Sequence, residues 1–435
     1  MSDIPDPDLP DQVGKATVVW HADFAWLGHV AQDVVIETGD GRIGRVIEGT
    51  KPPPGAKRLP GLTIPGLANV HSHAFHRALR ARTQRGAGDF WAWRRLMYEE
   101  AARLDPDSYF ELALGVYREM AQAGITIVGE FHYLHHAPGG EPYDDPNAMG
   151  AALIAAAGEA GLRMTLIDAC YLWSGIGKGV LEGVQLRFGD GSAERWSARV
   201  ERLRPGPDVR VGAAVHSVRA VDVAGIVAVA GWAKRSEAPF HVHVSEQPSE
   251  NEECRAATGV TPTRLLADAG VLASSTTAVH ATHVDSSDIV LLGDAGAAVC
   301  LCPTTERDLG DGVGPAAALA AAGARLCVGT DSHAMIDVFE EARAVELDQR
   351  LVTNRRGHHS PEGLLEAATA AGYAALGWDG GRIAAGCLAD FITLDLASPR
   401  LAGIPTEDLA AGAVFAATAA DVRTVVVGGR TIIGG

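Results

Sequence analysis

The stretch Leu62-Thr63-Ile64-Pro65-Gly66-Leu67-Ala68-Asn69-Val70-His71-Ser72-His73 joins an apolar run to a His-x-His pair. The run predicts a buried strand over residues 63–70, with the two histidines directly at its end. Alternate residues of a strand point to the same face, so both imidazoles would be aimed at one point. Two convergent imidazoles suit a divalent metal such as zinc, which needs about two more ligands in a stable site. The stretch therefore predicts half of a metal site.

Three later apolar runs carry side chains of the same chemistry at their ends. His243 lies at the end of one run and is followed by Glu246; His280 ends the next, and Asp331 follows the last. A lone histidine in such a place is more often structural than a ligand. Four groups of this kind at successive strand ends favour a metal site instead. Imidazole and carboxylate ligands suit zinc, iron or manganese.

Between about residues 63 and 380, short apolar runs alternate with segments of helical period. The expected strands are 63–70, 126–131, 164–169, 209–215, 240–244, 277–280, 298–302 and 325–329. The expected helices between them include 107–124, 147–161, 220–233, 261–269 and 314–323. Eight strands that alternate with helices predict a parallel array, which closes naturally into a (β/α)8 barrel. Functional residues then lie at the carboxyl ends of the strands.

The two ends of the chain differ from the middle. Short β-like runs occur at 16–20 and 33–37, and again at 390–394 and 422–433, with turn residues between them. We therefore expect residues 1–62 and 381–435 to form one small β-sandwich domain in two halves. Residues 63–380 would form the barrel.

The 435 residues carry a formal net charge of −17, which argues against a general affinity for nucleic acid or an anionic membrane. An anionic substrate would have to be bound by local arginines. The chain has no apolar stretch of the ~18 residues that span a membrane, and its first residues lack the basic start and apolar core of a secretory signal. The six cysteines are scattered without a paired framework. These features favour a cytoplasmic protein.

The strand-end residues resemble those of the amidohydrolase superfamily, and the resemblance covers nearly the whole chain. It implies that the metal ligands are His71, His73, His243 and Asp331. It also implies catalytic roles: Glu246 moves protons, Asp331 accepts a second proton, and His280 faces the substrate. Binuclear members need a carboxylated lysine, but only Lys178 and Lys234 follow the His-x-His pair, and neither ends an expected strand. One divalent ion, zinc above all, is therefore expected.

Segments beside these ligands carry a finer resemblance. They are H-S-H-A-F (71–75), W-x-W-R (91–94), E-F-H-Y (130–133), H-S-x-R (216–219), C-P-T-T-E (302–306) and L-G-D-G (309–312). In this order they are similar to the formimidoylglutamate deiminase family of histidine degradation, although His76 and Asp308 stand where that family has Gln and Asn. The resemblance implies hydrolysis of N-formimino-L-glutamate to N-formyl-L-glutamate and ammonia. It implies substrate binding by His76, Arg94, Tyr133, His216 and Arg219.

The substrate that the resemblance implies has two carboxylates, and the set contains two arginines. A planar guanidinium binds a carboxylate through two hydrogen bonds. Arg94 and Arg219 would bind the two carboxylates of the small-molecule dianion. A related deaminase that acts on an aminated heterocycle, such as guanine or an adenosine derivative, is the main alternative. It would stack its substrate on Trp91 and Trp93. A non-catalytic scaffold should have lost ligands or the proton shuttle, and this chain retains them. A homodimer is expected from the family.

Overall fold

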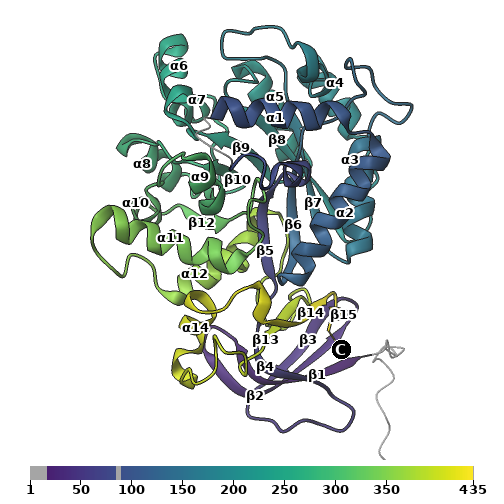
Figure 1. Ribbon diagram of the computed structural model, residues 1–435, viewed down its shortest axis with the longest axis vertical. Coiled ribbons are helices and arrows are strands. Elements are labelled where there is room, and N and C mark those ends of the chain that lie inside the picture. The colour runs from purple at the N-terminus through teal and green to yellow at the C-terminus, as the bar shows by residue number, and fades with distance from the viewer. Residues whose placement is uncertain (1–16, 85–89, 435) are drawn as a thin grey trace, which may run out of the picture.

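The computed structural model describes residues 17–84 and 90–434, which form a barrel of strands and helices above a smaller, mostly β part (Figure 1). Within these ranges, no helix combines the length and the apolar character needed to cross a membrane. The predicted absence of a secretory signal concerns the first residues of the chain, which lie outside the described residues.

The barrel is an eight-stranded sheet whose strands pair in parallel in the order β12-β11-β10-β9-β8-β7-β6-β5. Its strands are β5 (Leu67–Ser72), β6 (Ile125–His132), β7 (Arg163–Cys170), β8 (Val209–Ser217), β9 (Phe240–Val244), β10 (Thr276–His280), β11 (Ala298–Leu301) and β12 (Arg325–Val328). The residues of β5, β6, β7 and β9 are all buried, as in parallel sheets covered on both faces.

The sheet closes where β5 meets the residues just after β12. Ser72 and Asp331 form a parallel bridge. The Asp331 amide donates to the His71 carbonyl (2.9 Å), and the His73 amide donates to the Asp331 carbonyl (3.1 Å). This closure places Asp331 beside the His-x-His pair, although 258 positions separate it from His73 (331 − 73).

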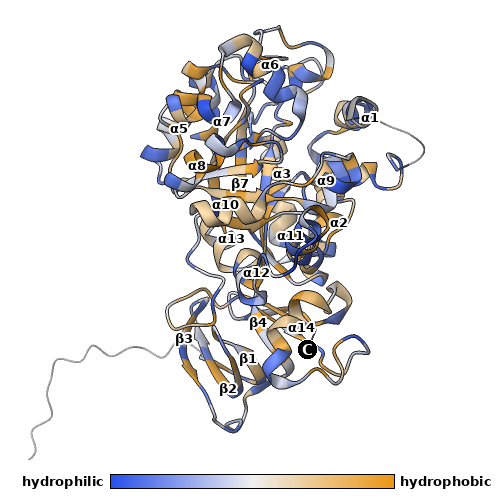
Figure 2. Ribbon diagram, turned by 90° about the vertical axis from the view of Figure 1, so that its left-hand side faces the viewer, coloured by the Kyte–Doolittle hydropathy of each residue, from blue (hydrophilic) through white to orange (hydrophobic). Residues whose placement is uncertain are grey.

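Helices surround the strands, and the apolar colours of Figure 2 gather on the strands and on the helices packed against them. The helices are η1 (Ala74–Leu79), α1 (Phe90–Arg103), α2 (Pro106–Gln122), α3 (Ala148–Ala160), η2 (Gly183–Arg187), α4 (Ala193–Val200), α5 (Val223–Arg235), α6 (Pro248–Thr258), α7 (Pro262–Asp268), α8 (Ser286–Asp294), α9 (Pro303–Leu309), α10 (Ala316–Ala322), α11 (Val338–Thr353), α12 (Pro361–Ala368) and α13 (Ala370–Ala375). Local sequence sets several of their ends. Asp105 caps α2 in a capping box with Ser108, and α3 ends at Gly161 with a φ of 81°.

The smaller part is one mixed sheet with the strand order β15-β14-β13-β4-β1-β2-β3. Its strands are β1 (Val18–Trp26), β2 (Val30–Gly39), β3 (Arg42–Ile47), β4 (Lys57–Pro65), β13 (Phe391–Leu394), β14 (Val422–Val427) and β15 (Arg430–Ile433). The short η3 (Thr406–Asp408), α14 (Leu409–Phe415) and η4 (Ala419–Asp421) lie between β13 and β14. Strand β4 joins the two halves, because it pairs with β1 on one side and with β13 on the other. The predicted fold class is confirmed: a (β/α)8 barrel with a small β domain built from both ends of the chain. That small domain is one mixed sheet and not the sandwich of two sheets that was expected, because β4 pairs with strands of both halves and so joins them edge to edge. The domain limits at residues 62 and 381 remain a proposal.

One expected strand is wrong in its extent. The run 63–70 is two strands, because the chain leaves the small sheet at Pro65 and enters the barrel at Leu67. Gly66 connects the two strands, and there is no room for a side chain at this position. A Cβ there would lie 2.1 Å from the hydroxyl oxygen of Thr126. Its amide donates to the carbonyl of Asp390 (3.0 Å), so the turn is tied to the second half of the small sheet.

We expect Asp390→Ala to destabilise the fold by ~3–5 kcal/mol, the usual cost of removing one partner of a buried ion pair. The carboxylate of Asp390 is fully buried and binds Nε of Arg163 at the start of β7 (2.7 Å). It also accepts from the hydroxyl of Tyr373 (2.9 Å) and the amide of Gly428 (2.7 Å). Urea unfolding of the variant measures the loss.

The control is Asp268→Ala, which breaks an exposed ion pair with Arg264 on one helix. Such pairs contribute about 0–1 kcal/mol. Equal losses in the two variants would contradict a structural role for the buried pair between the barrel and the small sheet.

Candidate active site

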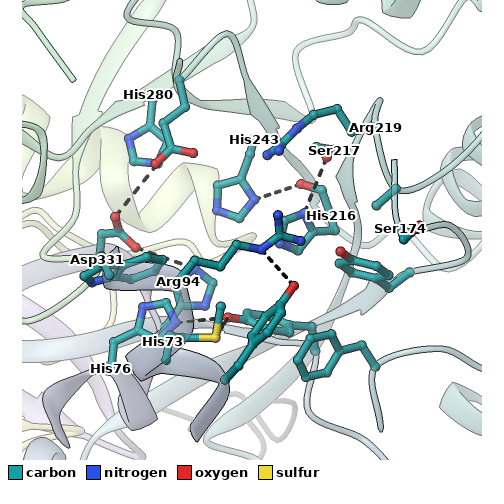
Figure 3. A pocket seen from close by; sticks show the side chains of 18 of the residues that line it. His73, His76, Arg94, Ser174, His216, Ser217, Arg219, His243, His280 and Asp331 are labelled. Atoms are coloured by element: carbon teal, nitrogen blue, oxygen red, sulfur yellow. Dashed lines mark hydrogen bonds and ion pairs between the residues drawn. The ribbon is translucent and has the colours of Figure 1, made fainter. Parts of the chain in front are cut away.

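The carboxyl ends of the barrel strands open into one pocket (Figure 3). The predicted site residues that line it are His73, His76, Arg94, Tyr133, His216, Arg219, His243, Glu246, His280 and Asp331. His71 does not line the pocket, because it is fully buried behind the other ligands. The structure therefore brings the predicted metal, catalytic and substrate-binding residues together in one place.

The predicted metal ligands converge. Nε2 of His71 lies 3.0 Å from Nε2 of His243. Oδ1 of Asp331 lies 3.5 Å from Nε2 of both His71 and His73. Burial would raise the pKa of Asp331, but hydrogen bonding and charge from His71, with the charges of His280 and His73, hold it well below its usual range. The cluster thus offers a carboxylate and three imidazoles at one point.

The tautomers in this cluster fit a bound cation. Nδ1 of His73 donates to the carbonyl of Phe131 (2.9 Å), and Nδ1 of His243 donates to the carbonyl of His216 (2.8 Å). Burial lowers the pKa of both rings well below the usual value. Because a carbonyl accepts from Nδ1 of each ring, Nε2 remains to face the cluster, and Nε2 of His73 lies 3.5 Å from Oδ1 of Asp331. A divalent ion would satisfy both, with the second ring nitrogens already bonded as ligating histidines require.

A second His/Asp group, made of His132, His135 and Asp168, is close enough to hold a metal, but its carboxylate is already paired. Asp168 forms a bidentate ion pair with Arg199 (2.7 and 2.9 Å) and accepts from Nε1 of Trp196 (2.8 Å). A carboxylate that is saturated by a cation and an indole is a poor metal ligand. We interpret this group as structural.

Glu130 fixes the turn that carries the His-x-His pair. Its carboxylate accepts from the hydroxyl of Ser72 (2.5 Å) and from the amide of Ala74 (2.7 Å). Burial raises the pKa of Glu130 to about 8. The sequence shows Glu130 only as the first residue of E-F-H-Y, and no role was assigned to it from the sequence.

His280 lies among three carboxylates. Its Nε2 is 3.8 Å from both Glu246 Oε1 and Asp331 Oδ2, and its Nδ1 is 3.4 Å from Glu306 Oε1. Burial alone would lower the pKa of His280, but the charge of Glu246 and the hydrogen bond with Glu306 raise it well above the usual value. Glu306 was missed by the sequence reasoning. Its only signal was its place at the end of C-P-T-T-E.

The backbone bends sharply where these side chains enter the site. Ser245, His280 and Asp331 have positive φ angles of 52°, 69° and 42°, a region that residues other than glycine rarely adopt. The amide of Glu246, just after the first bend, donates to the carboxylate of the buried Glu250 (3.2 Å). Strain of this kind persists where surrounding contacts hold it, commonly at functional sites.

Aromatic side chains form one wall of the pocket. Nε of Arg94 donates to the hydroxyl of Tyr98 (2.8 Å), and Nε2 of His76 lies 2.9 Å from the hydroxyl of Tyr133. His132, the residue before Tyr133, packs edge-on against His135 and is not among the residues that line the pocket. The indole of Trp93 lines the wall, whereas the side chain of Trp91 lies outside the described residues. Sequence reasoning assigned no role to Tyr98, Tyr171, Trp173 or Phe188, which also line the pocket.

Two guanidinium groups point into the pocket beside His216 and His243 (Figure 3). They belong to Arg94 on α1 and to Arg219 just after β8. In the described part of the chain, Nε of Arg219 is buried without a hydrogen-bond partner. Burial would lower the pKa of Arg219, but the charges of Glu250 and Glu246 raise it. The pocket can therefore bind carboxylate groups at one end while a reacting group lies at the His/Asp cluster.

The chain is similar to known proteins over most of its length. The model of the amidohydrolase family matches residues 62–432. A formimidoylglutamate deiminase of Pseudomonas aeruginosa is 37% identical over 87% of this chain and 86% of its own length. A 5-methylthioadenosine/S-adenosylhomocysteine deaminase of Natronomonas pharaonis is 29% identical over 86% and 81%. The crystal structure of an amidohydrolase from Brucella melitensis superposes with a TM-score of 0.87, at 33% identity over 96% of this chain and 95% of that one.

Proposed function

The chain belongs to the amidohydrolase family of metal-dependent hydrolases, and we propose that it releases ammonia from N-formimino-L-glutamate and leaves N-formyl-L-glutamate. It is an enzyme that hydrolyses a non-peptide carbon–nitrogen bond. One observation carries the choice of substrate: two guanidinium groups face the same pocket as the His/Asp cluster. N-formimino-L-glutamate has two carboxylates outside its amidine head, so Arg94 and Arg219 would bind the carboxylates while the amidine carbon lies at the cluster. His76, Tyr133 and His216 would add hydrogen bonds.

We propose one divalent ion, zinc, held by His71, His73, His243 and Asp331. When bound there, it supplies Lewis-acid activation of water at neutral pH. The donor set supports zinc, because neutral imidazoles and a carboxylate are its usual catalytic ligands.

The residues around the amidine carbon carry the proton transfers. Glu246 takes a proton from the attacking water and delivers it to the terminal nitrogen of the substrate. His280 donates a hydrogen bond to the developing oxyanion, which stabilises its charge. Asp331 accepts the second proton from the hydroxyl of the adduct, and Glu246 protonates the terminal nitrogen again as its bond to carbon breaks. The nitrogen therefore leaves as ammonia, with both protons of the water accounted for. The low exposure of the Glu246 side chain (12%) supports this role, because burial raises its pKa and favours proton uptake.

Ammonia release from a panel of substrates tests the proposal. The zinc-loaded protein should act on N-formimino-L-glutamate, and neither guanine nor 5-methylthioadenosine should release ammonia. N-formimino-L-aspartate should react poorly, because its shorter chain cannot reach both arginines with the amidine in place. Release from a purine but not from the glutamate compound would favour the alternative deaminase, for which stacking on Trp91 and Trp93 was expected, and Trp93 lines the pocket. It would reject the proposed substrate and leave the metal site standing.

The setting of the enzyme is part of the same proposal. We place it in histidine degradation in the cytoplasm, as a homodimer that binds neither nucleic acid nor membrane. The net charge of −17 supports the exclusion of polyanionic partners. Light scattering of the purified protein tests the homodimer.

A further inference from the structure

Arg187, the last residue of η2, is a buried cation with only 1% of its surface exposed. The described part of the chain contains no ion pair to it. Its donors go to uncharged oxygens: Nε to the carbonyl of His136 (2.8 Å), and Nη2 to the carbonyl of Leu104 (2.6 Å) and the hydroxyl of Tyr143 (3.4 Å). Nη1 donates to the carbonyl of Ala101. Burying a cation with no carboxylate beside it costs desolvation free energy, so the contacts of Arg187 must offset that cost.

Two of these oxygens belong to the end of α1. Ala101 lies in its last turn, and Leu104 follows its last residue. The last carbonyls of a helix have no partner within the helix, and they form the negative end of its dipole. Arg187 therefore satisfies the free end of α1 with hydrogen bonds and with positive charge.

Helix α1 is an addition to the barrel, not part of its wall. Figures 1 and 2 show it outside the helices that surround the strands. It lies between β5 and the wall helix α2 in the chain order, so no strand pairing holds it in place. Other contacts of α1 to the rest of the chain include an ion pair of Glu100 with Arg82 and a contact of Met97 with Tyr133.

The inner face of α1 nevertheless forms part of the substrate pocket through Trp93, Arg94, Met97 and Tyr98. Phe188, the residue after Arg187, completes the connection. Its ring lies 6.0 Å from that of Tyr98 and 5.1 Å from that of Tyr133. Tyr98 in turn accepts the hydrogen bond from Nε of Arg94. A continuous set of contacts thus links Arg187 to the guanidinium that faces the substrate.

We propose that Arg187 is a positioning residue for substrate binding: it fixes α1 so that Arg94 points into the pocket, although it does not itself line the pocket. This inference rests on the proposed function, in which Arg94 binds a substrate carboxylate. A looser α1 lowers the fraction of molecules whose Arg94 is in place, which weakens binding of the substrate more than the chemical step.

The main test is Arg187→Lys, which keeps the charge but not the planar fork that reaches several carbonyls. The KM for N-formimino-L-glutamate should rise about tenfold, as for the loss of one charge-assisted contact, with little change in kcat. In an Arg94→Gln background the same substitution should have no further effect on KM. An unchanged KM, or an effect that adds fully to that of Arg94→Gln, would overturn the proposal.

Arg163→Lys is the matched control, because Arg163 at the start of β7 is similarly buried but binds Asp390, at the end of the barrel that faces the small sheet. It should lower the melting temperature without raising KM. Should Arg187→Lys fail to fold, Tyr98→Phe tests the same connection from the pocket side. It should raise KM in the wild-type background and leave KM unchanged in the Arg94→Gln background, and an additive effect would count against the proposal.

Hydrogen exchange separates failure of this inference from failure of the proposed function. In Arg187→Lys the amides of α1 should exchange faster, while those of β8 and β9 stay protected. This readout needs no substrate. A wild-type protein that does not act on N-formimino-L-glutamate would reject the proposed function alone, whereas unchanged exchange in α1 would reject the role of Arg187.

Discussion

Removal of the divalent ion is expected to abolish ammonia release, and return of zinc is expected to restore it. Nε2 of His73 lies 3.5 Å from Oδ1 of Asp331, and Nε2 of His71 lies at the same distance from it, an arrangement that a bound cation would stabilise. Without the ion, only a carboxylate base can activate the water at the site. The pKa of that water then stays far above neutral, so very little hydroxide forms. Dialysis against a chelator, with metal content and turnover measured together before and after adding zinc, checks this. His243→Asn should lose both metal and turnover.

The second His/Asp group provides the control for this experiment. His135→Asn should keep the metal, because Asp168 is already paired with Arg199. Full turnover in a metal-free protein would contradict the metal site. Metal lost from His135→Asn but kept in His243→Asn would show that the ion is bound elsewhere. Reloading with iron or manganese in place of zinc measures which ions support turnover.

Glu246→Gln is expected to lower kcat by ~10²–10⁴-fold, the usual cost of losing a general acid–base. Metal content and KM should change little, because Glu246 lies 3.8 Å from His280 and is not among the residues that converge on the metal position. Glutamine has the same shape but cannot accept or deliver the proton. Steady-state kinetics and metal analysis of the purified variant measure both quantities.

The same substitution at Glu252, which is exposed on α6, should leave turnover unchanged. Near-normal turnover in Glu246→Gln would reject its role as the proton shuttle. A loss of metal in that variant would instead indicate that Glu246 supports the ligands directly.

Much of the fold could be predicted because the barrel repeats one local pattern. Each strand is a short apolar run, and each wall helix has a helical period, so the eight strands and the helices near 107–124 and 147–161 were predicted close to their observed positions. The run 63–70 was predicted as one strand because its hydrophobicity is continuous. Its division at Gly66 depends on a contact with Thr126 and a hydrogen bond to Asp390, both distant in the sequence.

Most of the site residues that sequence reasoning found lie at strand ends, where a barrel forces them to converge whatever the details of packing. His76 on η1 and Arg94 on α1 were named from the family resemblance instead. Those that it missed act through contacts that no local pattern records. Glu306 faces Nδ1 of His280 from the helix after β11, and Phe188 reaches the pocket from the position just after η2. Neither residue type is unusual in its own segment.

By itself, the sequence determined the ligand types, their order along the chain and the barrel that gathers them, because strand periodicity and strand-end positions are local properties. Only the tertiary structure decided which side chains face one another. The closure of β5 onto Asp331 and the hold of Arg187 on α1 are hydrogen bonds between residues far apart in the chain. Their geometry depends on the packing of the whole barrel. For that reason the type of chemistry could be predicted from the sequence, whereas the way in which Arg94 on α1 is held in the pocket could not.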